Sequence, residues 1–298
     1  MVRQYKIHTN LDGTDDKVWD VTNGKVRFYQ PSNLGLQSTN NIWQSNGIGV
    51  MGTRSITQPQ IEFKLETFGE SLEENYQLMK DFVNDIISKK FVTLEYQTEI
   101  FQVYADLALA DVTKTEGYGK NGTFSEKITF DVITKWYTYE NLTFDKIKNG
   151  KVIAGKSKIY GGLAPGNYKY IKGISYTYYG ESNIDRLSRW DIKDEIFSFM
   201  GILYPQLPKT PTGVRFLDDI GNEYTAIVFN TEQVLDYILI NTDVNDEIYQ
   251  GWNGTTSLNL FPVMDFERYR TRIIEKGQME LINLSKAEFK IKRKADFV

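Results

Sequence analysis

Short segments in which apolar and polar residues alternate run through most of this sequence. In IEFKLE, residues 61–66, the apolar side chains Ile61, Phe63 and Leu65 are separated by charged ones. The same alternation recurs in KITFDV, EYTAIVF, DYILIN, TSLNLF and AEFKIKR. Because successive side chains of a strand point to opposite faces of a sheet, this pattern predicts strands that cover a core with one face. The chain is therefore expected to be mostly β.

Pairs of Asp or Asn followed by Gly separate many of these segments. Such pairs supply the positive φ angles that a tight hairpin turn requires, so we expect turns at these places. The pairs are Asp12-Gly13, Asn23-Gly24, Asn46-Gly47, Asn121-Gly122, Asn149-Gly150 and Asn253-Gly254.

One stretch has helical periodicity instead. Ser71 is followed three residues later by Glu74, which is the pattern of a helix capping box. Apolar residues then recur at helical spacing, and Lys89 and Lys90 stand where cations suit the helix dipole. We predict one helix over about 71–89, packed on a sheet. Its apolar stripe is Leu72, Tyr76, Met79, Phe82, Val83, Ile86 and Ile87.

Composition excludes several classes of function. The chain has 298 residues, no Cys, one His and a net charge of −4, so thiol catalysis and zinc fingers are excluded and nucleic acid is not attracted overall. No apolar run approaches the ~18 residues of a membrane span, and the N-terminus lacks a signal-peptide core. We expect no cofactor, no metal, no specific nucleic-acid partner, no membrane contact and no enzymatic activity.

Three local patterns could carry chemistry. Residues 47–52 match G-x-G-x-x-G, but the strand and helix that a dinucleotide site needs do not flank them, which favours a glycine-rich loop between strands. His8 alternates with Tyr5, Ile7 and Thr9, which favours an ordinary strand residue over a catalytic base. The acidic groups Asp12, Asp15, Asp16 and Asp243, Asp246, Glu247 lack calcium-loop spacing and are interpreted as solvated turns, with loose calcium binding as the alternative.

Tyrosine is concentrated around GISYTYYG, residues 173–180. Six of the 19 tyrosines lie between Tyr160 and Tyr179, among glycines and without the usual core residues. Tyrosine suits interfaces because it buries a large ring and keeps a polar tip. For Trp190 and Trp252 we favour buried strand positions, and for the tyrosines a contact surface. The residues proposed to contact a partner are Tyr168, Tyr170, Tyr176, Tyr178 and Tyr179.

The chain is long enough for two domains. The α+β segment ends near residue 140, and a second set of strands begins near Trp190 and would form a β-sandwich. We predict domains over 1–140 and 141–298, with an extended arm inserted at about 146–189. The last strand, 287–298, is placed in the second domain, with a return to the first as the alternative.

The α+β segment, the Gly-rich lead into GTRSITQPQIEFKLE and the capped helix that follows resemble the distal tail proteins (Dit) of siphophages, especially their lactococcal members. The resemblance covers the whole chain. It implies an N-terminal belt domain that forms a six-membered ring, and a galectin-like C-terminal sandwich whose arm holds receptor-binding proteins. The ring would join the major tail protein of the tail tube to the tail-tip protein in a virion made in the host bacterial cytoplasm.

Galectin sugar sites use a histidine, and the second domain has none. The sugar site therefore cannot be transferred to this chain with the fold. The leading hypothesis is a structural hub of the baseplate for host adsorption. The alternatives are a carbohydrate-binding module that acts directly on the host wall and a glycan-cleaving enzyme, which would need two facing carboxylates.

Overall fold

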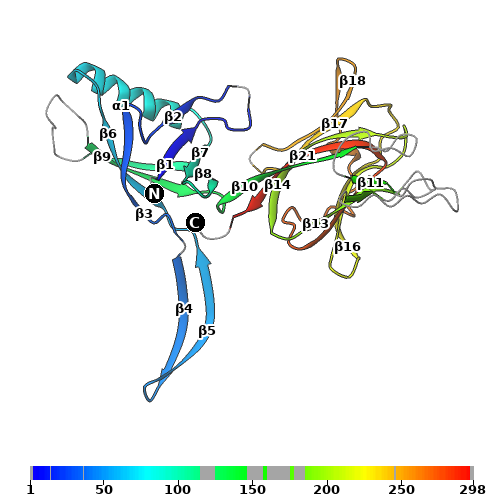
Figure 1. Cartoon of the computed structure of the whole chain (residues 1–298), viewed down its shortest axis with the longest axis horizontal. Coiled ribbons are helices and arrows are strands. Elements are labelled where there is room, and N and C mark those ends of the chain that lie inside the picture. Colours follow the sequence, from blue (N-terminus) through cyan, green and yellow to red (C-terminus); the bar gives the residue numbers. More distant parts are fainter. Residues whose placement is uncertain are drawn as a thin grey trace. The chain divides into compact units, whose positions relative to one another are not determined.

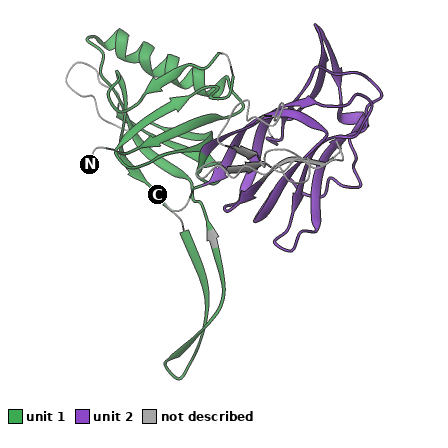
Figure 2. Cartoon of the chain, turned by 45° about the vertical axis from the view of Figure 1, so that its right-hand side comes forward, with its two compact units in different colours: residues 1–138, 295–298 green, residues 139–294 purple. Residues whose placement is uncertain are grey.

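The computed structural model describes residues 3–13, 15–35, 37–114, 125–145, 157–159, 175–177, 185–244 and 246–295. The chain divides into two compact units, shown in Figure 2. Unit 1 comprises Met1–Thr138 and Ala295–Val298, and unit 2 comprises Tyr139–Lys294. Among the described residues, no helix is long and apolar enough to cross a membrane.

Unit 1 is built from antiparallel strands and one helix (Figure 1). The elements are β1 (Gln4–His8), β2 (Val18–Asp20), β3 (Val26–Ser32), β4 (Gln37–Ser45), β5 (Ile48–Thr57), β6 (Ile61–Thr67), α1 (Leu72–Ile87), β7 (Val92–Gln97), β8 (Gln102–Thr113), β9 (Ser125–Val132) and the start of β10 (Tyr137–Asp145).

The long strand β8 connects two runs of strands in unit 1. Its first half pairs with β7, which continues to β1 and β2, and its second half pairs with β9, which continues to β6 and β3. Leu107 is paired with both β7 and β9, and the register with β9 shifts between Leu109 and Asp111. The alternation of IEFKLE is confirmed, because Ile61, Phe63 and Leu65 are fully buried in the core between these strands.

Helix α1 covers this core with one face. Phe82 and Ile86 are buried, and the Phe82 ring meets Phe28 of β3 and the Trp19 ring edge-on. Ser71 caps the helix, since its hydroxyl accepts the Glu74 N–H at 3.1 Å. The Glu74 carboxylate reaches back to the Glu70 N–H at 2.7 Å, so only the serine half of the predicted capping box is formed.

Unit 2 contains two antiparallel sheets. One has the order β19-β18-β17-β14-β21-β10 and the other the order β13-β20-β15-β16. The elements are β11 (Ser157–Ile159), β12 (Ser175–Thr177), β13 (Asp185–Ile192), β14 (Ile196–Pro205), β15 (Thr212–Leu217), β16 (Glu223–Phe229), β17 (Tyr237–Asn241), β18 (Ile248–Asn253), β19 (Thr256–Asn259), the 3₁₀ turn η1 (Phe261–Val263), β20 (Gly277–Ile282) and β21 (Leu284–Lys294).

The two sheets of unit 2 enclose one core. Phe199 of β14 lies 5.9 Å from Phe216 of β15, ring centre to ring centre, so side chains of the two sheets interdigitate as in a sandwich. The chain end is divided between the units: Lys294 N–H donates to the Glu195 carbonyl within unit 2, and Ala295 N–H donates to the Trp136 carbonyl within unit 1.

The prediction of a mostly β chain with one packed helix is confirmed. Each of the six alternating segments contains a strand, although TSLNLF ends its strand at Asn259 before η1 begins. Two of the Asx-Gly pairs turn hairpins between strands, Asn46-Gly47 and Asn253-Gly254. Asn121-Gly122 and Asn149-Gly150 lie outside the described residues.

Candidate assembly surface

The hairpin of β4 and β5 extends away from the rest of unit 1 (Figure 1). Its register pairs Ile42 with Met51 and Trp43 with Val50. Asn46 and Gly47 at its turn both have positive φ, 49° and 78°, which is the type I′ geometry that continues the twist of the strands. Within the described part of the chain, β4 and β5 pair only with each other.

The G-x-G-x-x-G match lies in this hairpin. Gly47 is in the turn, but residues 48–52 belong to strand β5, so the expected loop between strands is wrong for most of the motif. A Cβ atom added at Gly52 would lie 3.4 Å from the Trp43 side chain of the opposite strand. One added at Gly49 would lie 3.2 Å from the Ile42 side chain. The glycines leave room for the larger side chains across the ladder.

Large apolar side chains of the hairpin face water. Trp43 is 69% exposed, Ile48 70% and Val50 65%, and every residue of β4 is exposed. Residues 37–57 carry a single charge, that of Arg54. A two-stranded ribbon is only marginally stable alone, and a ribbon with a single charge, exposed apolar side chains and two open edges is a template for pairing with another chain. The hairpin therefore has the character of a contact surface.

Helix α1 adds a second exposed apolar surface to unit 1. Leu72, Tyr76 and Ile87 were predicted to face the core, and this is wrong: they are 53%, 60% and 63% exposed. Asn75 occupies a buried position of the helix instead, where its side chain bonds the backbone of Gly69 and Ser71. A polar residue at a core position could not be recognised from apolar periodicity.

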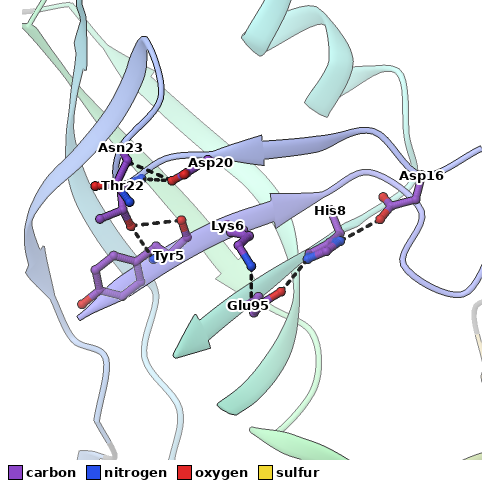
Figure 3. A network of polar contacts seen from close by, with 8 residues as sticks. All are labelled: Tyr5, Lys6, His8, Asp16, Asp20, Thr22, Asn23 and Glu95. Atoms are coloured by element: carbon purple, nitrogen blue, oxygen red, sulfur yellow. Dashed lines mark hydrogen bonds and ion pairs between the residues drawn. The ribbon is translucent and has the colours of Figure 1, made fainter. Parts of the chain in front are cut away.

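His8, the last residue of β1, is at the centre of a polar network that links β1 to the paired strand β7 (Figure 3). Its Nδ1 lies 2.7 Å from Asp16 Oδ2 and its Nε2 lies 2.8 Å from Glu95 Oε2. Lys6 Nζ donates to Glu95 Oε1 at 3.0 Å. Each ring nitrogen of His8 therefore faces a carboxylate oxygen, and the ring is held between two acidic side chains.

This network stabilises the fold and has no catalytic geometry. Burial raises the pKa of the Glu95 carboxyl, and hydrogen bonds from His8 and Lys6 lower it by more, so it lies below its usual range. Both ring nitrogens of His8 are engaged by carboxylates of the fold, so neither is free to act on a substrate. His8 is thus a strand residue as predicted, but a buried and doubly paired one. Among the described residues, no group of three His, Cys, Asp or Glu side chains is arranged so that it could hold a metal ion.

The second acidic segment differs from the expected solvated turn. Asp243 is buried and forms an ion pair with the buried Lys292 of β21, whose Nζ lies 2.9 Å from Asp243 Oδ2. Glu247 does lie at the surface, where Arg272 pairs with it at 2.7 Å. Alternation in AEFKIKR gave Lys292 no sign of burial, because the lysine could equally face water.

Most of the predicted contact tyrosines lie outside the described residues, namely Tyr168, Tyr170, Tyr178 and Tyr179. Tyr176 is in β12, which pairs in parallel with β11, where Lys158 is its partner. Trp190 is half-buried and packs against the core of unit 2, as expected. Trp252 is half-buried on the outer face of its sheet, so its predicted core position is wrong.

Comparison with protein families gives the identity of both halves. A model described as the distal tail protein N-terminal domain matches residues 4–133, and one described as the Dit C-terminal domain matches residues 135–298. The chain belongs to the distal tail protein family. The resemblance inferred from sequence is thereby confirmed, as is the expectation of a structural, non-enzymatic component at the tip of a phage tail.

Two curated distal tail proteins are close relatives of this Dit chain. Those of Lactococcus phage p2 and Lactococcus phage SK1 are 95% and 93% identical over 298 residues, covering 100% of each chain. A 95% identical chain solved in the phage P2 baseplate, in its activated conformation with Ca, gives a TM-score of 0.79 over 100% of both chains. The SPP1 Dit protein, called a paradigm of hub adsorption apparatus in Gram-positive infecting phages, shares the fold at 10% identity and a TM-score of 0.53 over 98% of each chain.

Proposed function

We propose that this chain is the hub of a siphophage baseplate and that six copies close a ring through unit 1. The β4–β5 hairpin carries the proposal. A closed ring needs a surface that each copy extends to the next one, and a hairpin with open edges and exposed Trp43 and Val50 suits that role. The family membership and the solved baseplate of phage P2 support the same place in the virion.

The ring would join the major tail protein above to the tail-tip protein below. The arm at about 146–189 would hold the receptor-binding proteins, through Tyr168, Tyr170, Tyr176, Tyr178 and Tyr179. Unit 2 would be the outward, galectin-like domain that presents the arm. In this arrangement the chain positions the receptor-binding proteins on the tail, and those proteins recognise the host.

The energy available at the hairpin is large enough to govern assembly. A Trp side chain offers about 200 Å² of surface, so covering the exposed 69% of Trp43 removes roughly 140 Å² from water and contributes about 3–4 kcal/mol at ~25 cal/mol per Å². Losing that contact in each interface of a ring is expected to shift the equilibrium strongly towards monomers.

Native mass spectrometry of the full chain tests the proposal. The unaltered chain should give a six-copy mass, and Trp43→Ser with Val50→Ser should give monomers with an unchanged melting temperature, because exposed side chains contribute little to folding. Ile220→Ser is the matched control, since Ile220 is 83% exposed but lies in unit 2, in the turn between β15 and β16. Rings that persist in the hairpin variant would contradict the assignment of this surface.

The arm requires a separate measurement. Replacing Tyr176, Tyr178 and Tyr179 with alanine should weaken capture of purified receptor-binding protein by ~2 kcal/mol or more if these rings form a hot spot. The six-copy mass should be unchanged, because the substitutions lie outside unit 1. Unaltered capture would place the contact elsewhere in 146–189. The alternative function, direct binding of carbohydrate, is favoured by the adjacent aromatic side chains Tyr204, Tyr237 and Trp252 of unit 2.

A further inference from the structure

A row of aromatic side chains crosses the larger sheet of unit 2. Tyr237 of β17 is directly opposite Trp252 of β18, with ring centres 6.1 Å apart and planes at 13°. Tyr204 of the next strand, β14, is 6.4 Å from Tyr237. Lys286 of β21 is paired with Tyr204 and places its ammonium 5.1 Å from that ring. Trp252, Tyr237, Tyr204 and Lys286 are called the aromatic row below.

The row lies on the outer face of the sheet. The neighbours of its members along the strands, Leu203, Ile238 and Gly251, are buried in the sandwich core, so alternation points the row the other way. Each member is half-buried by its neighbours in the row and keeps part of its surface accessible. Four adjacent strands at ~4.8 Å give the row a length of about 14 Å.

The polar tips of these rings are able to bind a ligand. Within the described residues, no hydrogen bond is made by the phenol groups of Tyr204 and Tyr237 or by the Trp252 indole N–H. Each tip is able to donate a hydrogen bond, and the phenols are also able to accept. Exposed Gln250 and Ser257 flank the row and add neutral polar groups.

We propose that the aromatic row binds a linear oligosaccharide. A pyranose ring has an apolar C–H face and an equatorial rim of hydroxyls, which matches flat aromatic rings bordered by unpaired donors and acceptors. The sequence of rings along one line suits a chain of sugars more than a single sugar. This inference does not depend on the ring proposed for unit 1, because the row lies wholly in unit 2.

Two other ligand classes fit the row less well. Single-stranded nucleic acid also stacks on aromatic rows but needs a positively charged groove, whereas here Lys286 is neutralised by Glu288 at the end of the row. A protein partner would be expected to cover protruding aliphatic groups, as on the β4–β5 hairpin, whereas the aliphatic side chains beside this row, Ile202 and Leu239, are half-buried.

A microarray of linear hexasaccharides of glucose, galactose, mannose and N-acetylglucosamine tests the proposal with the full chain. The chain should bind at least one class, and Trp252→Ala should weaken that binding about tenfold or more, as for one base lost from an aromatic stack. Trp43→Ala is the matched control, because it removes an exposed tryptophan from unit 1 and should leave sugar binding unchanged. Circular dichroism verifies that each variant is folded.

A second variant, Tyr237→Phe, keeps the ring and removes only the hydroxyl. It is expected to fold even if Trp252→Ala fails to fold. It should weaken binding severalfold, since one hydrogen bond to the sugar is lost. Failure of the unaltered chain to bind any hexasaccharide overturns the proposal, as does binding that survives both substitutions. If the parent chain binds no sugar and Trp252→Ala no longer captures the receptor-binding protein, the aromatic row is a protein contact and the proposal is overturned.

Discussion

Replacing Glu95 with Gln would isolate the polar network of unit 1. The Glu95 side chain is 5% exposed and accepts from both His8 and Lys6. Glutamine has the same size but carries no charge and offers one acceptor, so one of the two donors would face an amide N–H₂. The contact to the buried His8 is worth about 1.5–3 kcal/mol and the contact to Lys6, which is 36% exposed, at most ~1 kcal/mol. The amide oxygen should therefore stay with His8, and the expected loss is about 1 kcal/mol.

The pH dependence of this loss has a defined sign. The pKa of Glu95 is lowered in the folded chain, so its contribution to stability is present above the ordinary glutamate value of about 4.3 and is lost as pH falls through the folded pKa. The stability difference between the parent and Glu95→Gln should therefore be full near neutral pH and should shrink as the carboxyl becomes protonated in the parent.

Urea unfolding followed by the NMR signals of the His8 ring provides the assay. His8 is the only histidine in the chain, so these signals report unit 1 without interference from unit 2. Glu99→Gln is the control, since Glu99 is an exposed residue just after β7. A stability loss no greater than that of the control would refute the argument from the network.

Three further substitutions have defined outcomes. Ser71→Ala removes the cap of α1 and should cost unit 1 about 1 kcal/mol in urea unfolding. Gly47→Val forces a β-branched residue to a φ of 78° at the hairpin turn. It should reduce the fraction of chains found in the six-copy species by native mass spectrometry and leave the melting temperature unchanged. Lys292→Met leaves Asp243 buried without its ion pair and should cost unit 2 about 3–5 kcal/mol; the double change with Asp243→Leu should recover part of that loss in thermal unfolding.

The strands and the helix could be predicted because local rules and tertiary packing agree there. The segment IEFKLE alternates in sequence, and strand β6 buries every second side chain in the core of unit 1. Ser71 caps α1 at the helix start that the sequence predicts. The helix stripe was predicted less well. Leu72, Tyr76 and Ile87 share a helical arc with the core residues, and sequence periodicity cannot tell how wide a face the sheet covers.

The polar sites could not be predicted, because they depend on contacts between distant residues. His8 meets Glu95 and Asp243 meets Lys292 across 87 and 49 positions of sequence. Each partner is of a type usually found at the surface, and burial becomes favourable only when both are present. The aromatic row has the same origin: Trp252, Tyr237 and Tyr204 align through strand register, which composition alone does not fix.

The surfaces proposed for contact are separate from the residues that hold the fold. The core of unit 1 is closed by residues such as Phe63, Phe82 and Phe130, none of which lies in the β4–β5 hairpin. Within the described part of the chain the two hairpin strands pair only with each other, so their exposed residues contribute little to the free energy of unfolding. A sequence can therefore change at Trp43, or at Trp252 in unit 2, and lose a binding function while the fold persists. The converse holds for His8 and Glu95, where substitution should weaken the fold first and any assembly only as a consequence.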